Sequence, residues 1–430
     1  MKPDSRTALL LALIALVGVI ALTLQRRTPI EDPNVVAEVT PLTADSRRQT
    51  ADGSPSQAQD QTADSSRQFP ETIPTPTLTL TPSPTLTPSL TPTITPTVPT
   101  PTETRRPSPT PEPWPEPLSA PGQSKIGLHV TVNSDPRAME FVRRVKPSLI
   151  FAIGDTGFLA EVKAVSPSTV TIARYDDADY SVIGRVSPEE WAHTFVDQHL
   201  ERYRLNPGVD YWEGWNEYRP LDPAAWDWYT RFEAERARYM DSLGLRAAVG
   251  TLSTGVPEWG EMANFIPALR AARDSGGIFT LHEYAAPTLY CGVGAGPADA
   301  PILSGVETGA LTLRYRYWYE SYLKPQGLGD LRLAITEAGI DGIARQEVCG
   351  GPPGFGWKDY VSYWAGAGFG DDSTTAYLEQ IKWYDSRVRQ DSYVIGFALF
   401  TMGAVGSPNH STYDLHDMAI PLAQYMATQK

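Results

Sequence analysis

Short apolar runs rich in β-branched residues recur eight times along the chain, and longer stretches with helical spacing separate them. Runs of this length and composition are typical of strands that are buried on both faces. We therefore expect eight strands, at residues 125–132, 148–153, 169–174, 211–217, 246–252, 278–284, 331–337 and 394–401.

The stretches between these runs carry helix start signals. Ser187 has the features of an N-cap, Pro188 stands at the first helical position, and Glu190 completes a capping box. Apolar residues then follow with helical period as far as Tyr203. A second start signal, Asp222 followed by proline, predicts the next helix.

Eight strand-then-helix units in one domain favour a parallel (β/α)8 barrel, the TIM-barrel architecture, over residues 123–430. An open doubly wound sheet is the alternative. A nucleotide-binding version of that sheet has little support, because neither GxGxxG nor a P-loop follows the first run.

The N-terminal part has a different composition. Residues 8–24 form an uncharged apolar run that would span about 26 Å as a helix. We expect residues 1–28 to be a membrane anchor, with a cleaved signal peptide as the alternative. Either way the chain leaves the cytoplasm, for the cell surface in the first case and for secretion in the second.

Residues 29–122 lack the apolar residues that a core needs, and the stretch 70–118 is mostly Thr-Pro and Ser-Pro. Proline fixes φ and removes a backbone donor, so polyproline-II segments are expected there. We interpret 29–122 as a stiff disordered linker that holds the barrel away from the membrane.

The net charge of −14 disfavours nucleic acid, whose phosphates attract basic surfaces. The two cysteines, Cys291 and Cys349, lie in Gly/Pro-rich stretches and lack metal-site spacing. In an exported protein we expect them to form a disulfide between two loops, after the sixth and seventh strands. We expect no cofactor and no metal, and a monomer.

Polar residues gather at the ends of the predicted strands, where a (β/α)8 barrel holds its active site. The fourth run ends in Asn216 and Glu217, the sixth in His282 and Tyr284, and the seventh in Glu337. The fourth and seventh strands lie on opposite sides of the barrel, so their terminal side chains face each other across its mouth. Two carboxyl groups placed in this way are what the hydrolysis of a glycoside requires.

These motifs resemble the clan-A glycoside hydrolases, the (β/α)8 group that includes the family-5 cellulases and mannanases. The resemblance covers roughly residues 125–425. It implies that Glu217 is the acid/base, that Glu337 is the nucleophile and that Asn216 binds a sugar hydroxyl. It also implies a hydrogen bond from Tyr284 to the nucleophile, with His282 beside it.

The chain departs from the family pattern at three places. Tyr218 stands where a proline usually follows the acid/base. The second run lacks the family's arginine, for which Arg174 on the third run is a substitute. Phe400 and Thr401 stand where the family has a tryptophan at the end of the eighth strand.

The resulting hypothesis is a retaining O-glycosidase that acts on an extracellular poly- or oligosaccharide. Trp357, in a Gly-rich stretch after the seventh strand, is a candidate for stacking on a sugar ring, with packing within its own loop as the alternative. Glu213 is interpreted as a structural ion-pair partner. The main rival is a non-catalytic carbohydrate-binding barrel, either an adhesin or a sensor. A metal-dependent hydrolase ranks last, because the first run lacks His-x-His.

Overall fold

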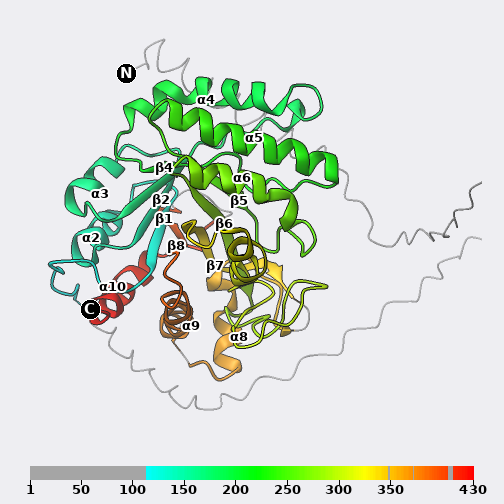
Figure 1. Cartoon of the computed structure of the whole chain (residues 1–430). Coiled ribbons are helices and arrows are strands. Elements are labelled where there is room, and N and C mark those ends of the chain that lie inside the picture. The colour runs from blue at the N-terminus through cyan, green and yellow to red at the C-terminus, as the bar shows by residue number, and fades with distance from the viewer. Residues whose placement is uncertain (1–112, 347–348, 371, 405–409) are drawn as a thin grey trace, which may run out of the picture. The chain divides into compact units, whose positions relative to one another are not determined.

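The computed structural model describes residues 113–346, 349–370, 372–404 and 410–430, and they form an eight-stranded parallel barrel wrapped by helices (Figure 1). The strand order is β4-β3-β2-β1-β8-β7-β6-β5, and a parallel bridge from Trp212 to Ala247 joins the two end strands. Each predicted run overlaps one strand. The strands are β1 (Ile126–Val130), β2 (Leu149–Ile153), β3 (Val170–Arg174), β4 (Tyr211–Trp212), β5 (Ala248–Leu252), β6 (Ile278–Ala286), β7 (Leu333–Arg345) and β8 (Val394–Met402).

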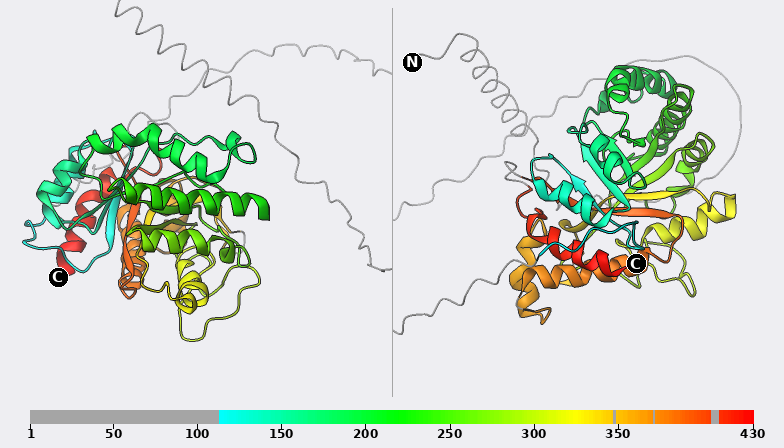
Figure 2. Two further views of the ribbon diagram at one scale, coloured as in Figure 1. Left: turned by 45° about the horizontal axis from the view of Figure 1, so that its top comes forward. Right: turned by 90° about the vertical axis from the view of Figure 1, so that its left-hand side faces the viewer.

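Helices cover the outside of the barrel, and the two longest, α4 and α5, lie side by side along one flank (Figure 2). The predicted starts are correct, since Ser187 and Asp222 accept hydrogen bonds from Glu190 and Ala225. The helices are α2 (Pro136–Val145), α3 (Leu159–Val165), α4 (Pro188–Leu205), α5 (Pro223–Ser242), α6 (Met262–Asp274), α7 (Tyr315–Trp318), α8 (Val361–Gly366), α9 (Ser373–Val388) and α10 (Ala419–Thr428).

The strand residues alternate between two apolar layers. One set, with Phe151 and Ile172 among its members, packs inside the barrel. The other set, with Leu128 and Ala173, packs outward against the helices. Strands buried on both faces explain why the runs read as continuously apolar.

Strand β4 is much shorter than the predicted 211–217, and a buried ion pair accounts for the difference. The Arg236 guanidinium, bound to Glu233 at 2.8 Å, donates to the carbonyl oxygens of Trp212 and Ala248 at 3.1 and 2.6 Å. A side chain thus occupies acceptors on β4 and β5 that a regular ladder would use. At Gly214, an added Cβ would lie 2.6 Å from Glu233 Oε1, so a larger residue there would displace this ion pair.

The described chain begins earlier than the predicted boundary at residue 123. Trp114 and Leu118 pack against the core, and Leu118 N–H donates to the Arg144 carbonyl oxygen at 2.8 Å. Arg144 in turn donates to the Pro115 carbonyl oxygen at 3.0 Å. The assignment of 113–122 to the linker is therefore wrong, because two apolar side chains pack against the core and hydrogen bonds with Arg144 tie this segment to α2.

The predicted anchor at 8–24 and the rest of the linker lie outside the described residues. Within those residues, the structure contains no helix that is both long and apolar enough to cross a membrane.

Candidate active site

The predicted site residues come together at the carboxyl ends of the strands. Arg174 ends β3, Glu217 follows β4, His282 and Tyr284 lie on β6, and Glu337 lies on β7. Strands β6 and β7 pair in register at His282 and Glu337, just after a bulge. Bulges often redirect side chains beside active sites, and here the bulge allows Glu337 to follow Thr336 into the barrel mouth.

Glu337 is a buried carboxylate with a donor at each oxygen. The Tyr284 hydroxyl donates to Oε2 at 2.8 Å, and Arg174 donates to Oε1 at 3.4 Å. Burial by itself would raise the pKa of Glu337, but the charges of His282 and Arg174, with the hydrogen bond from Tyr284, outweigh burial and lower it from 4.5 to about 2. The group is therefore ionised at neutral pH.

His282 lies between the two glutamates. Its Nδ1 is 2.7 Å from Glu217 Oε1 and 3.6 Å from Glu337 Oε2. Burial opposes protonation, but the charge of Glu337 and the hydrogen bond to Glu217 prevail, so the pKa of His282 is raised. The raised pKa favours a proton on Nδ1, which donates to Glu217, and a protonated ring offsets the negative charge of Glu337.

The two glutamates differ in their access to solvent. The Glu217 side chain is 37% exposed, whereas that of Glu337 is 10% exposed. An oxygen of each carboxylate and a nitrogen of His282 all lie within 4.8 Å of one another. One carboxylate is thus fixed in the floor of the site, and the other stands at its mouth.

The backbone of Glu217 is strained. Its φ is +50°, in the left-handed region that residues other than glycine rarely adopt, and its N–H donates to the Thr251 carbonyl oxygen at 3.0 Å. Strain of this kind persists only where surrounding structure enforces it, and it concentrates at functional sites.

Arg174 also ties the site to the barrel interior. It donates to Glu213 Oε2 at 2.8 Å, and Thr336 donates to the other oxygen of Glu213 at 2.7 Å. Glu213 is therefore the structural ion-pair partner that the sequence suggested. His129 is buried below Glu337, and burial lowers its pKa to about 3, so this histidine is neutral.

The site opens into a cavity of about 530 Å³. The predicted residues Glu217, Tyr284 and Glu337 line this cavity. The other lining residues were not predicted for this role from the sequence; they are Asp341, Ile343, Phe355, Phe400, His410, Thr412 and Tyr413. Phe400, near the end of β8, contributes an aromatic ring to this cavity.

Two other predicted binding residues are placed differently. Trp357 is 3% exposed, stacks on Tyr377 and donates to the Tyr413 carbonyl oxygen at 3.2 Å, so it does not offer a free face for a sugar. The packing alternative holds instead. Asn216 directly precedes Glu217, but its Oδ1 is buried without a hydrogen-bond partner and the residue does not line the cavity.

Cys291 and Cys349 form a disulfide with a Cα–Cα distance of 5.8 Å. It joins the loops after β6 and β7, the two strands that carry Tyr284 and Glu337. The link restrains the β7 loop that leads to Phe355 at the cavity.

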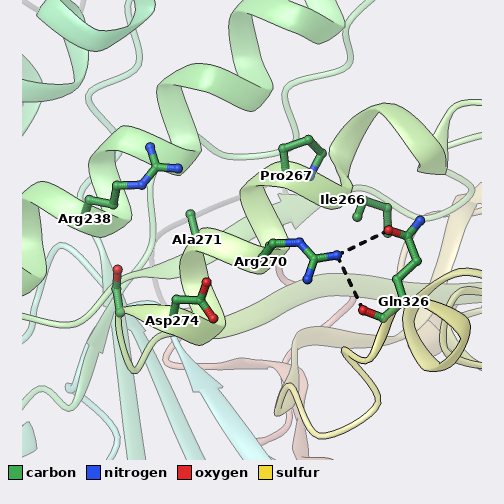
Figure 3. Close-up of a pocket in the computed structure, with 8 residues that line it drawn as sticks. Arg238, Ile266, Pro267, Arg270, Ala271, Asp274 and Gln326 are labelled. Atoms are coloured by element: carbon green, nitrogen blue, oxygen red, sulfur yellow. Dashed lines mark hydrogen bonds between the residues drawn. The ribbon is translucent and has the colours of Figure 1, made fainter.

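A second cavity, of about 330 Å³, lies along α6 and contains none of the predicted residues (Figure 3). Its main polar contact is internal, because Arg270 donates to the backbone and side-chain oxygens of Gln326 at 3.4 Å. The strand-end cavity is therefore the candidate active site.

The architecture and the site together define a parallel α/β barrel with paired glutamates, one in the segment after β4 and one on β7. No family model matches the sequence, and no curated protein matches it either.

Solved structures with a similar fold include glycoside hydrolases. The endo-1,4-beta-D-mannanase from Thermotoga petrophila RKU-1 is 13% identical, with a TM-score of 0.40 over 71% of this chain and 99% of that chain. XacCel5A, solved with cellopentaose, is 13% identical, with a TM-score of 0.38 over 70% and 99%. A beta-glucuronidase from an uncultured Clostridium sp. is 11% identical, with a TM-score of 0.38 over 71% and 50%. At these values the likenesses assign no role to any residue here.

Proposed function

We propose that the protein is a retaining O-glycosidase that hydrolyses poly- or oligosaccharides. The observation that carries the proposal is the pairing of a buried, ionised carboxylate at Glu337 with a solvent-accessible one at Glu217, with oxygens within 4.8 Å. Retaining glycosidases hold their carboxyl groups about 5–5.5 Å apart, whereas inverting ones leave about 6.5–9.5 Å for a water molecule. The close approach of the oxygens supports retention.

In this mechanism the Glu337 carboxylate attacks the anomeric carbon and forms a glycosyl ester. Glu217 donates its proton to the leaving oxygen in the same step. In the second step Glu217 removes a proton from water, the water oxygen attacks the anomeric carbon, and Glu337 leaves as a carboxylate.

Supporting groups suit these two roles. Tyr284 and Arg174 hold both oxygens of Glu337, which orients the nucleophile and stabilises its charge before attack. His282 orients Glu217 through the 2.7 Å contact. Glu217 lies at the mouth, where it can exchange a proton with water between the two steps.

Three rival functions lead to different expectations. A carbohydrate-binding barrel would gain nothing from keeping a buried charge at Glu337, which must be compensated by several donors. Glu217, His282 and Glu337 also have the spacing of a metal site. The Arg174 guanidinium 3.4 Å from Glu337 would repel a dication there, so activity should survive dialysis against EDTA. An enzyme that acts on acyl or phosphoryl substrates would show no dependence of its activity on the anomeric configuration of a glycoside.

We also propose that the site acts outside the cytoplasm, at the cell surface if residues 8–24 anchor the chain. The Cys291–Cys349 disulfide supports this location, because such bonds persist in oxidising compartments.

The test is a screen of the full chain against polysaccharides and aryl glycosides, with Glu337→Ala as the blank. For a substrate that is cleaved, proton NMR of the first-formed product reports its anomeric configuration. Retention is the expected result. Inversion would refute the double-displacement mechanism, and cleavage that is equal in the Glu337→Ala variant would refute the site.

A further inference from the structure

The cavity is built almost entirely from one side of the barrel. Of the residues that line it, only Glu217 follows β4, and the rest come from β6, β7, β8 and the loops after β7 and β8. In the proposed mechanism the leaving oxygen takes its proton from Glu217, and the sugar unit under attack becomes bonded to Glu337 on β7. The walls near β7 and β8 therefore surround the glycone, the part of the substrate that becomes attached to Glu337.

Asp341 stands in that wall, on β7 beyond Glu337. Its Oδ1 accepts hydrogen bonds from Ile343 N–H at 2.8 Å and from the Tyr413 hydroxyl at 3.0 Å. Both of these hydrogen bonds reach Oδ1, and neither reaches the other oxygen, Oδ2. One oxygen is thus fixed by the protein, which orients the carboxylate and leaves the second oxygen available to a ligand.

The charge of Asp341 is not balanced by a protein cation. Arg174 pairs with Glu213 and Glu337, and His282 lies between Glu217 and Glu337. No lysine, arginine or histidine of the described chain lies within ion-pair distance of Asp341. Burial, together with the nearby charges of Glu217 and Glu337, raises the pKa of Asp341, whereas its two hydrogen bonds oppose the rise. A ligand that brings hydrogen-bond donors would stabilise this carboxylate.

We propose that Asp341 determines glycone specificity: Oδ2 accepts hydrogen bonds from a sugar unit that presents hydroxyl or ammonium donors, and it excludes units that carry a carboxylate or sulfate. The inference rests on the proposed function for its substrate class. Like charges brought together in a partly dry site cost several kcal/mol, whereas a donor satisfies an oxygen that is otherwise left to water. Neutral and amino sugars thus fit the cavity, and uronic acids and sulfated sugars do not.

The experiment measures binding rather than turnover. The full chain carrying Glu337→Gln, which keeps printed glycans intact, is applied to an array of neutral, amino, uronate and sulfated oligosaccharides. The same background is tested with Asp341→Asn, which is isosteric and keeps an acceptor at Oδ1 for Tyr413 and Ile343. Asp241→Asn is the matched control, because Asp241 is exposed on α5 far from the cavity residues.

The background protein should bind neutral or amino glycans at least about tenfold more tightly than their anionic counterparts. Asp341→Asn should reduce that ratio about tenfold, and Asp241→Asn should leave it unchanged. A larger loss for amino glycans would identify ammonium as the donor, and an equal loss for neutral glycans would identify hydroxyl.

Three outcomes would overturn the assignment. The ratio of affinities for neutral or amino glycans over anionic ones could be unchanged in Asp341→Asn, the background protein could prefer anionic glycans, or it could bind no glycan at all. Failure of the proposed function would look different. Selective binding that depends on Asp341, without hydrolysis by the unmodified chain, would refute catalysis and leave the role of Asp341 intact.

Discussion

The Tyr284 hydroxyl donates to Oε2 of Glu337 at 2.8 Å, from the strand that neighbours β7 in the barrel. Because the two strands are joined by backbone hydrogen bonds, the phenol and the carboxylate cannot drift apart without disturbing the sheet. The contact fixes the plane of the carboxylate and stabilises its charged form.

Replacing Tyr284 with Phe should therefore raise the pKa of Glu337 and move the acidic limb of the kcat/KM profile to higher pH. The direction of the shift follows from the ionised form, which is the nucleophile in the proposed mechanism. The pKa of Glu337 is lowered to about 2, and removing a hydrogen-bond donor makes its protonation easier. The rate should fall about tenfold or more, since a charge-assisted hydrogen bond contributes about 1.5–3 kcal/mol.

The measurement is kcat/KM against pH for wild type and Tyr284→Phe on one confirmed substrate, with far-UV circular dichroism to show that both stay folded. Loss of rate with the acidic limb in place would mean that Tyr284 only shapes the cavity.

Arg174 should matter for stability as well as for rate. It is buried and pairs with both Glu213 and Glu337, so Arg174→Met leaves two carboxylates without their cation. Removing one partner of a buried ion pair costs about 3–5 kcal/mol. Urea unfolding should show that loss.

Arg231→Met is the matched control, because Arg231 pairs with Glu189 on the solvent-exposed surface of α5 and α4. An exposed pair is worth about 0–1 kcal/mol. Equal effects of the two substitutions would show that the buried network does not hold the barrel together.

Much of the fold follows from residue patterns that the sequence displays openly. The eight apolar runs correspond to the eight strands, and the caps at Ser187 and Asp222 start the helices as predicted. Glu217 and Glu337 could be singled out because a carboxylate at the end of a buried strand is costly unless it is used.

Other features depend on contacts between distant segments. The early end of β4 is caused by Arg236, which lies on α5 and gives no signal in the strand itself. Strand β7 continues to Arg345 through a Gly-rich segment that looks like a loop, and this extension carries Asp341 into the cavity. Trp357 and Phe355 stand two residues apart in one loop, so only the folded chain decides which of them is buried.

That loop leads to a prediction about sugar stacking. Phe355 lines the cavity and is 60% exposed, whereas Trp357 is packed on Tyr377. Phe355→Ala should raise KM for oligosaccharides about three- to tenfold with little change in the melting temperature, because an aromatic contact is worth about 0.5–1.5 kcal/mol. Trp357→Ala should instead destabilise the fold by about 3–5 kcal/mol. Thermal unfolding and steady-state kinetics on both variants separate the two roles, and a lower melting temperature for Phe355→Ala with KM unchanged would reverse the assignment.

The roles proposed for the two glutamates lead to distinct kinetic predictions. Glu337→Ala removes the atom that attacks the anomeric carbon, so turnover should vanish on every substrate. Glu217→Ala removes only proton transfer, which contributes about 10²–10⁴-fold. Dinitrophenyl glycosides, whose leaving group needs no proton, should still form the glycosyl ester in Glu217→Ala, and hydrolysis of that ester should then be slow because no base activates water.

Azide, an anion that needs no deprotonation, should accelerate turnover of Glu217→Ala and give a glycosyl azide with the configuration of the substrate. Stopped-flow release of dinitrophenolate measures the first step, and NMR of the azide product measures the stereochemistry. If azide instead rescues Glu337→Ala and has no effect on Glu217→Ala, the two assignments must be exchanged.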